Sequence, residues 1–165
     1  PLISAIRAAR EALDDCGKTD EVSLVAAGGI RSGTDVAKCL ALGADAVMIG
    51  TAGLVALGCN SPRYFDDYAA LGTAPGRCHH CHTGLCPVGV ATQDPELEKR
   101  VDVPAASERV ARFLTAMTME VSLLAKACGK SNVHNLEVED LRAMSLEASA
   151  FTGVKLAGID RPYSW

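Results

Sequence analysis

The sequence is poor in aromatic side chains and has neither a long apolar run nor a basic run. Aromatic residues make up 4% of its 165 residues, so the core must be aliphatic. No apolar stretch approaches the ~20 residues that span a bilayer, and nothing resembles a signal peptide. The formal net charge is −4 and no lysine- or arginine-rich segment occurs. We therefore expect no nucleic-acid partner, no membrane partner and a cytoplasmic location.

The overall composition is that of a globular chain. Hydrophobic residues make up 48% and charged residues 22%, which is typical of folded domains and not of disordered ones. The chain begins at Pro1, without a methionine, inside a helical pattern. We expect it to be a piece of a longer polypeptide.

The first third of the sequence alternates between helical and strand patterns. Helices are predicted over residues 2–15 and 35–42, the second capped by Thr34, and buried strands over residues 22–27 and 46–49. Such alternation predicts a parallel sheet with right-handed crossovers. Two strands do not make a stable sheet alone, so we expect the other strands to come from sequence outside this chain.

The remaining sequence is first irregular and then helical. A short helix is predicted over residues 54–57, an irregular proline-containing segment over 60–95, and helices from Pro104 to about Gly129 and over 138–151. The tail 160–165 has no clear pattern. We divide the chain into βα units of a barrel at 1–58, a cysteine-rich loop at 59–103 and a helical segment at 104–165.

Glycine-rich turns follow both predicted strands. Gly28, Gly29 and Arg31 follow the first strand, and Gly50 and Thr51 follow the second. Backbone N–H groups in such turns, together with the start of the following helix, form a site for a phosphate dianion. Two adjacent βα loops of this kind are the arrangement at strands 7 and 8 of a TIM barrel. The predicted fold class is therefore α/β, the C-terminal portion of a TIM barrel.

Cysteine is the strongest chemical signal. Three cysteines and three histidines fall between residues 78 and 86, and a further cysteine lies upstream. These four thiols belong to Cys59, Cys78, Cys81 and Cys86. Clustered thiols indicate a disulfide, a zinc site, an iron–sulfur cluster or a redox pair. Without an export signal, metal binding is favoured over disulfides. The isolated Cys16, Cys39 and Cys128 are expected to be small buried side chains.

Two stretches carry a family resemblance. Residues 27–38 and 42–51 resemble the phosphate end of FMN- and nucleotide-binding barrels, a group that includes inosine-monophosphate dehydrogenase and the FMN domain of glutamate synthase. The Leu-Gly-Cys at 57–59 and the Cys-His-Thr-Gly-Leu-Cys-Pro beginning at residue 81 are similar to the cluster loop of glutamate synthase large subunits. The dehydrogenase has no such loop. The resemblance covers residues 22–158, most of the chain.

The resemblance implies ligands for an iron–sulfur cluster. In glutamate synthases, a cysteine after Leu-Gly and a later Cys-x4-Cys-Pro bind a 3Fe-4S cluster, and these positions fall on Cys59, Cys81 and Cys86. The sequence departs from this pattern in a longer spacing between the first two and in a fourth thiol at Cys78. Because a 4Fe-4S cluster needs four cysteines, the cluster type stays open.

Zinc is the competing occupant of the thiols. Thiolates alone, or mixed with His79, His80 and His82, satisfy a tetrahedral zinc site. The spacing of the last three cysteines, ending in Cys-Pro, is nearer to that of ferredoxins than to paired zinc knuckles. Iron–sulfur is therefore the preferred interpretation, with His82 expected to donate a hydrogen bond to a cluster sulfur.

The resemblance also implies an activity, a glutamate synthase-like oxidoreductase in which electrons pass through the cluster to FMN. FMN would then reduce 2-iminoglutarate, formed from 2-oxoglutarate and ammonia, to glutamate. The implied partners are the rest of the FMN domain, a glutamine amidotransferase and an electron donor. Catalytic residues are expected outside this chain. One alternative is the FMN subunit of N-methylglutamate synthase. Another is an electron-transfer subunit, or a zinc-stabilised module, without catalysis of its own.

Overall fold

A computed structural model describes residues 1–159, which form two compact units. Unit 1 consists of residues 1–49 and 116–159, and unit 2 of the continuous stretch 50–115. The unclassified tail 160–165 lies outside the described residues. None of the helices in the described part is long and apolar enough to cross a membrane.

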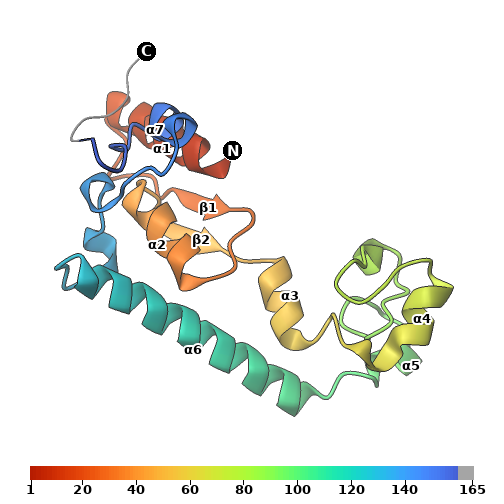
Figure 1. Cartoon of the computed structure of the whole chain (residues 1–165). Helices are drawn as coiled ribbons and strands as arrows, with labels where there is room; N and C mark the ends of the chain where they lie inside the picture. Colours follow the sequence, from red (N-terminus) through yellow and green to blue (C-terminus); the bar gives the residue numbers. More distant parts are fainter. Residues whose placement is uncertain (160–165) are drawn as a thin grey trace. The chain divides into compact units, whose positions relative to one another are not determined.

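The elements follow one another as helices with two short strands between them (Figure 1). Unit 1 contains α1 (Leu2–Asp15), β1 (Val25–Ala27), α2 (Gly33–Ala41), β2 (Ala46–Met48), the 3₁₀ turns η3 (Val133–Asn135) and η4 (Val138–Asp140), and α7 (Leu146–Thr152). Unit 2 contains α3 (Thr51–Leu57), η1 (Pro62–Tyr64), α4 (Phe65–Ala70), η2 (His80–His82) and α5 (Pro95–Glu98). The long α6 (Val103–Ala127) supplies residues to both units.

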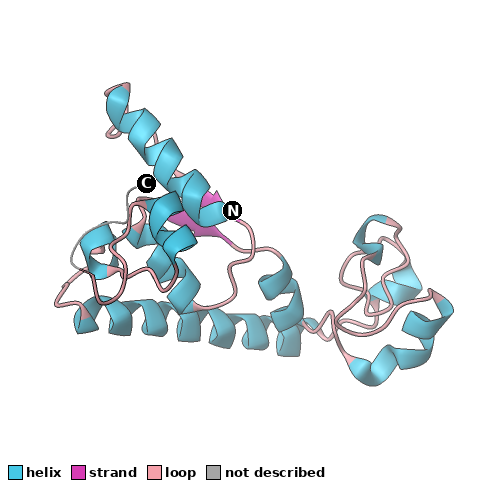
Figure 2. Cartoon of the chain, turned by 45° about the horizontal axis from the view of Figure 1, so that its top comes forward, coloured by secondary structure: helices cyan, strands magenta, loops and turns pink. Residues whose placement is uncertain are grey.

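The two strands pair in parallel, as the sequence predicts. Val25 is opposite Ala46 and Ala27 is opposite Met48, so both strands end at the same edge of the sheet. The predicted burial of the strands on both faces is wrong for this chain. Ala26 is buried, but Val25 is 49% and Met48 62% exposed. Figure 2 shows how short this sheet is beside the helices of unit 1, which leave part of its surface uncovered.

A buried arginine ties α1 to the start of β2. Arg10 donates to the carbonyl of Gly43 and to the carboxylate of Asp45, both over 2.7 Å. The same carboxylate accepts the N–H of Leu24 over 2.6 Å. This backbone hydrogen bond, aided by Arg10 and opposed by partial burial, lowers the pKa of Asp45. Asp45 therefore holds the residue before β1, Leu24, next to the residue before β2, which is Asp45 itself.

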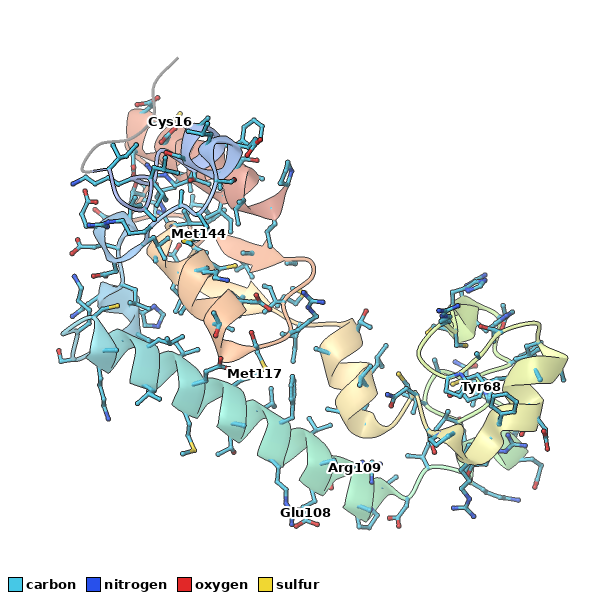
Figure 3. All side chains as sticks on the ribbon, viewed as in Figure 1. Cys16, Tyr68, Glu108, Arg109, Met117 and Met144 are labelled. Carbon is cyan, nitrogen blue, oxygen red and sulfur yellow. The ribbon has the colours of Figure 1, made fainter. Side chains whose placement is uncertain are left out.

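Helix α2 begins two residues earlier than the predicted Thr34 cap implies. The cap is Ser32, whose hydroxyl accepts the N–H of Asp35, and the helix starts at Gly33. The glycine is required by packing, because a Cβ atom there would lie 2.5 Å from the carbonyl oxygen of Met117 on α6. Met117 is labelled in Figure 3. A buried apolar cluster of unit 1 joins these two helices to the segment that follows η3. It contains Ala37, Leu40, Ala41, Val121, Ala125 and Leu136.

The C-terminal helices match the predictions in part. α6 was predicted from Pro104 to about Gly129 and spans Val103–Ala127, with its apolar stripe buried at Met117 and Val121. The predicted single helix over 138–151 is wrong. The chain makes the turn η4, then pairs Ala143 with Leu156, and α7 starts only after Ser145, whose hydroxyl caps it. α7 then packs beside α1 (Figure 1).

Candidate thiol and phosphate sites

The first thiol is positioned by the end of α3. Gly58 ends this helix in the left-handed conformation, with φ of 105°, and Cys59 follows. The carbonyl of Cys59 accepts a hydrogen bond of 2.5 Å from the hydroxyl of Tyr68 on α4. Tyr68 is completely buried within unit 2 (Figure 3). Glycine thus turns the chain, and tyrosine fixes the backbone on which Cys59 is carried.

The other three thiols come from the loop that wraps around Tyr68. Cys86 is buried and packs in one apolar cluster with Tyr68 and Val88, and the half-buried Cys78 lies against the same cluster. Cys81 is exposed on the 3₁₀ turn η2. All four cysteines are free thiols.

The electrostatics show that the four thiols converge. The pKa of the Cys59 thiol is raised by its burial and then by the charges of Cys81, Cys86 and Cys78. The pKa of Tyr68 is raised to about 12, again by burial first and then by Cys78, Cys59 and Cys86. Charges act strongly only over short distances in protein. The fold therefore brings Cys59, Cys78 and Cys86 near Tyr68, and it brings Cys81 near Cys59.

Arg100 braces the Cys86 segment from the outside. It donates to the carbonyl of Pro87 over 2.6 Å, pairs with Asp67 over 3.2 Å and lies over the ring of Tyr64, 4.8 Å from its centre. Asp67 precedes Tyr68 on α4. The same short helix thus holds the backbone at two cysteines, at Cys59 through Tyr68 and beside Cys86 through Asp67 and Arg100.

Gly89, three residues after Cys86, is held by a backbone hydrogen bond and by close packing. Its N–H donates to the carbonyl of Cys86 over 3.0 Å, and its φ is +83°. A Cβ atom there would lie 2.0 Å from the carbonyl oxygen of Leu97, so no other residue fits without moving the backbone. The Cys-Pro-Val-Gly turn is therefore packed tightly against α5.

The thiols of this loop are not gathered around the position of a single ion. Among residues 1–159, no three His, Cys, Asp or Glu side chains lie close enough to share one metal ion. Cysteines that hold an iron–sulfur cluster bind different irons, so their sulfurs lie farther apart than the ligands of one zinc. In the same stretch, the Nδ1 atom of His80 is buried without a hydrogen-bond partner. In the tautomer protonated at Nδ1, this nitrogen beside Cys81 can donate to an acceptor sulfur.

The predicted phosphate glycines lie at the edge where both strands end. Gly28 and Gly29 follow β1, with φ of 125° and 71°, and both are exposed. A Cβ atom built on either meets nothing within 4 Å, so the space over this turn is open. A ligand can approach the backbone closely here, which fits the predicted phosphate contact.

The start of α2, by contrast, is already occupied from within unit 1. The carboxylate of Glu120 on α6 accepts the N–H of Gly33 over 2.7 Å and the hydroxyl of Thr34 over 2.5 Å. These hydrogen bonds, Thr34 first, lower the pKa of Glu120. The N–H of Arg31 donates to Asp35. This helix start therefore offers a phosphate fewer donors than the sequence predicts, and the glycine turn remains.

Gly50 and Thr51 belong to unit 2. Gly50 is the N-cap of α3 without a side-chain cap, and Thr51 is the first residue of that helix. Both are exposed. They stay predicted phosphate contacts.

The isolated cysteines agree with the prediction in one case of three. Cys39 is buried on α2, and desolvation raises the pKa of its thiol. Cys16 and Cys128 are exposed, so their predicted burial is wrong. Both follow the last turn of a helix, α1 and α6 respectively, where the apolar stripe no longer faces the core.

Comparison with known families identifies the family of this chain. The region described as "Conserved region in glutamate synthase" matches residues 1–131, which include every predicted site residue. The chain belongs to the glutamate synthase family. No solved structure matches it.

Named glutamate synthase relatives are similar over nearly the whole chain. The "Glutamate synthase large subunit-like protein" of Rhizobium meliloti is 54% identical over 158 residues, which cover 96% of this chain and 36% of that protein. The "Archaeal glutamate synthase [NADPH]" of Methanocaldococcus jannaschii is 40% identical over 162 residues, 96% of this chain and 29% of that protein. The chain therefore spans about a third of the length of these relatives.

Sequence reasoning missed the residues that hold the thiol loop in unit 2 and the start of α2 in unit 1. Tyr68, Arg100 and Glu120 act on backbone groups far away in sequence, over 9, 13 and 87 positions. Periodicity reports only local neighbours. The one usable signal was the presence of Tyr64 and Tyr68 in an otherwise irregular segment, which indicates a small core of its own.

Proposed function

We propose that this chain is the C-terminal part of an FMN- and iron–sulfur-dependent glutamate synthase. In this proposal it contributes strands 7 and 8 of the FMN-binding barrel, the cluster-binding loop and the helices that follow. Membership of the family and the names of its relatives support this function. The structural observation that carries it is that three free thiols, Cys59, Cys78 and Cys86, lie near Tyr68, with Cys81 near Cys59.

The thiol site would hold the cluster. Cys59, Cys81 and Cys86 are the proposed ligands, and Cys78 is the fourth ligand if the cluster is 4Fe-4S. Tyr68 and Arg100 keep the backbone at Cys59 and beside Cys86 in place. The proposed hydrogen-bond donor to a sulfur is His80, because its Nδ1 is buried without a partner whereas His82 is exposed.

The glycine turns would hold the phosphate of FMN. Gly28 and Gly29 present open backbone to the ligand, Arg31 adds positive charge, and Gly50 and Thr51 add a second turn. Glu120 keeps the start of α2 rigid behind the first turn.

When bound, the cluster and FMN supply electron transfer and hydride delivery to 2-iminoglutarate, which yields glutamate. This chain's residues fix the position of both groups, while the contacts to substrate would come from the rest of the FMN domain. A glutamine amidotransferase and an electron donor are the further proposed partners. The relatives' names support glutamate as the proposed product, and N-methylglutamate is the alternative product.

The test is the cofactor content of the full-length protein, measured as iron, acid-labile sulfide, zinc and released FMN. Cys86→Ser should abolish visible cluster absorbance and iron binding. Cys39→Ser, a buried thiol of unit 1, is the matched control and should change neither. Zinc in place of iron and sulfide, or full absorbance in Cys86→Ser, would contradict the cluster assignment. Absence of FMN would contradict the phosphate site independently.

A further inference from the structure

A cavity in unit 2 remains unexplained by the cluster and by FMN. It has a volume of about 350 Å³ and lies between the end of α3, the start of α6 and the loop that follows Cys86. Pockets for small molecules have volumes of roughly 300–1,000 Å³. This one is near the lower end of that range, so its occupant would be small.

The cavity is positively charged although the chain is acidic. Arg63, Arg100 and Arg109 line it, against a single carboxylate from Asp102. That carboxylate is partly committed, because it accepts the N–H of Ala105 in the first turn of α6. The chain as a whole carries a net charge of −4. A pocket of opposite sign concentrates anions from solution.

The three arginines differ in how many of their N–H groups already donate hydrogen bonds within unit 2. Arg100 is engaged with Pro87 and Asp67, and Arg109 donates to the carbonyl of Leu57 over 2.7 Å. Arg63 only flanks the ring of Tyr64, and its guanidinium makes no hydrogen bond within residues 1–159. Among the same residues, the Nη1 atom of Arg109 also has no acceptor. Donors are therefore available from two sides of one cavity.

The remaining wall is aliphatic. Val88, Val90 and Val101 line the cavity together with Leu57. Inorganic anions gain nothing from such a wall, whereas a short methylene chain does. Guanidinium groups bind carboxylates through paired N–H donors.

We propose that this cavity binds a small dicarboxylic acid, with its carboxylates against Arg63 and Arg109 and its carbon chain against the valines. The proposal rests on the cavity alone and stands whether or not the cluster and FMN assignments hold.

Arginine footprinting of the full-length protein tests it locally. Phenylglyoxal modifies accessible guanidinium groups, and peptide mass spectrometry measures the rate at each arginine. Succinate is the probe, and sulfate at equal ionic strength is the control anion. Succinate should slow modification of Arg63 and Arg109 about ten-fold and leave the exposed Arg77, outside the cavity, unchanged.

Arg63→Gln provides the second arm, because the Arg63 guanidinium makes no hydrogen bond within residues 1–159. It should weaken the protection of Arg109 by succinate about ten-fold, while the matched Arg77→Gln should not. Absence of protection, or equal protection by sulfate, would overturn the proposal. So would an Arg63 that is unreactive without any ligand, because another segment of the full-length protein would then cover the cavity.

Discussion

The hydroxyl of Tyr68 donates to the carbonyl oxygen of Cys59 over 2.5 Å, and the tyrosine itself has no exposed surface. This bond connects the end of α3 to α4 through protein groups alone. Arg100, which pairs with Asp67 on α4, donates to the carbonyl of Pro87, so protein contacts hold the thiol site at a second point beside Cys86.

Tyr68→Phe should loosen the cluster without removing a ligand. The substitution leaves the carbonyl of Cys59 without its buried donor, which costs about 1–2 kcal/mol. We expect faster bleaching of the cluster by an iron chelator and a shifted reduction potential in the full-length protein. Tyr64→Phe is the control, since its hydroxyl makes only a 3.4 Å contact with the carbonyl of Arg100. Equal bleaching rates in the wild type and Tyr68→Phe would refute a bracing role.

Cys78→Ser should decide the cluster type. Cys78 packs beside Cys86 against the same apolar cluster, so it is placed to act as the fourth ligand. If it is one, the variant should convert a 4Fe-4S signal to a 3Fe-4S signal in electron paramagnetic resonance, with iron content falling from about four to three per chain. Cys128→Ser, an exposed thiol, should leave the spectrum unchanged. An unaltered 3Fe-4S spectrum in Cys78→Ser would show that Cys78 is not a ligand.

Gly29→Ala should weaken FMN binding more than it weakens the fold. Gly29 has φ of 71° with open space over it, so alanine adds backbone strain of about 1 kcal/mol and blocks close approach of a phosphate. Gly17→Ala is a matched control, because Gly17 has φ of 64° and open space but follows α1. We expect about ten-fold weaker FMN binding, or 1.4 kcal/mol, for Gly29→Ala alone. Equal FMN affinities in the two variants would refute the phosphate contact.

Asp45→Asn should remove a pH dependence from the stability of unit 1. The folded-state pKa of Asp45 is lowered, so its carboxylate stabilises unit 1 above the unfolded pKa of about 3.9 and loses this effect as pH falls through the folded pKa. Since the carboxylate is 46% exposed, solvent screening keeps the contribution near 1 kcal/mol.

Hydrogen exchange of peptides covering β1 and β2 measures this effect in the full-length protein. Near neutral pH the Asp45→Asn variant should exchange about five-fold faster than the wild type, and the difference should shrink below pH 4. Asp20→Asn removes an exposed charge elsewhere in unit 1 and serves as the control. A difference that does not depend on pH would show that the carboxylate is not the cause.

The sequence predicted what depends on local pattern. Helix α1, the parallel strand pair and α6 lie within a few residues of their predicted positions, because periodicity and glycine stops determine them. Prediction from the sequence failed where contacts between residues far apart in the chain determine the structure. The helix expected over 138–151 is interrupted because Ala143 pairs with Leu156. The start of α2 was expected to be open to a phosphate, but Glu120 reaches it from 87 positions away.

The same separation has a consequence for how the chain is made. Unit 2 is one continuous stretch, whereas unit 1 also needs residues 116–159, which cover α2 and bring Glu120 to its first turn. During synthesis, the whole thiol-bearing unit has therefore emerged before unit 1 can close. Because domains fold as units while the chain is growing, the cysteine loop can assemble around Tyr68 before the part of α6 that packs against α2 has been made.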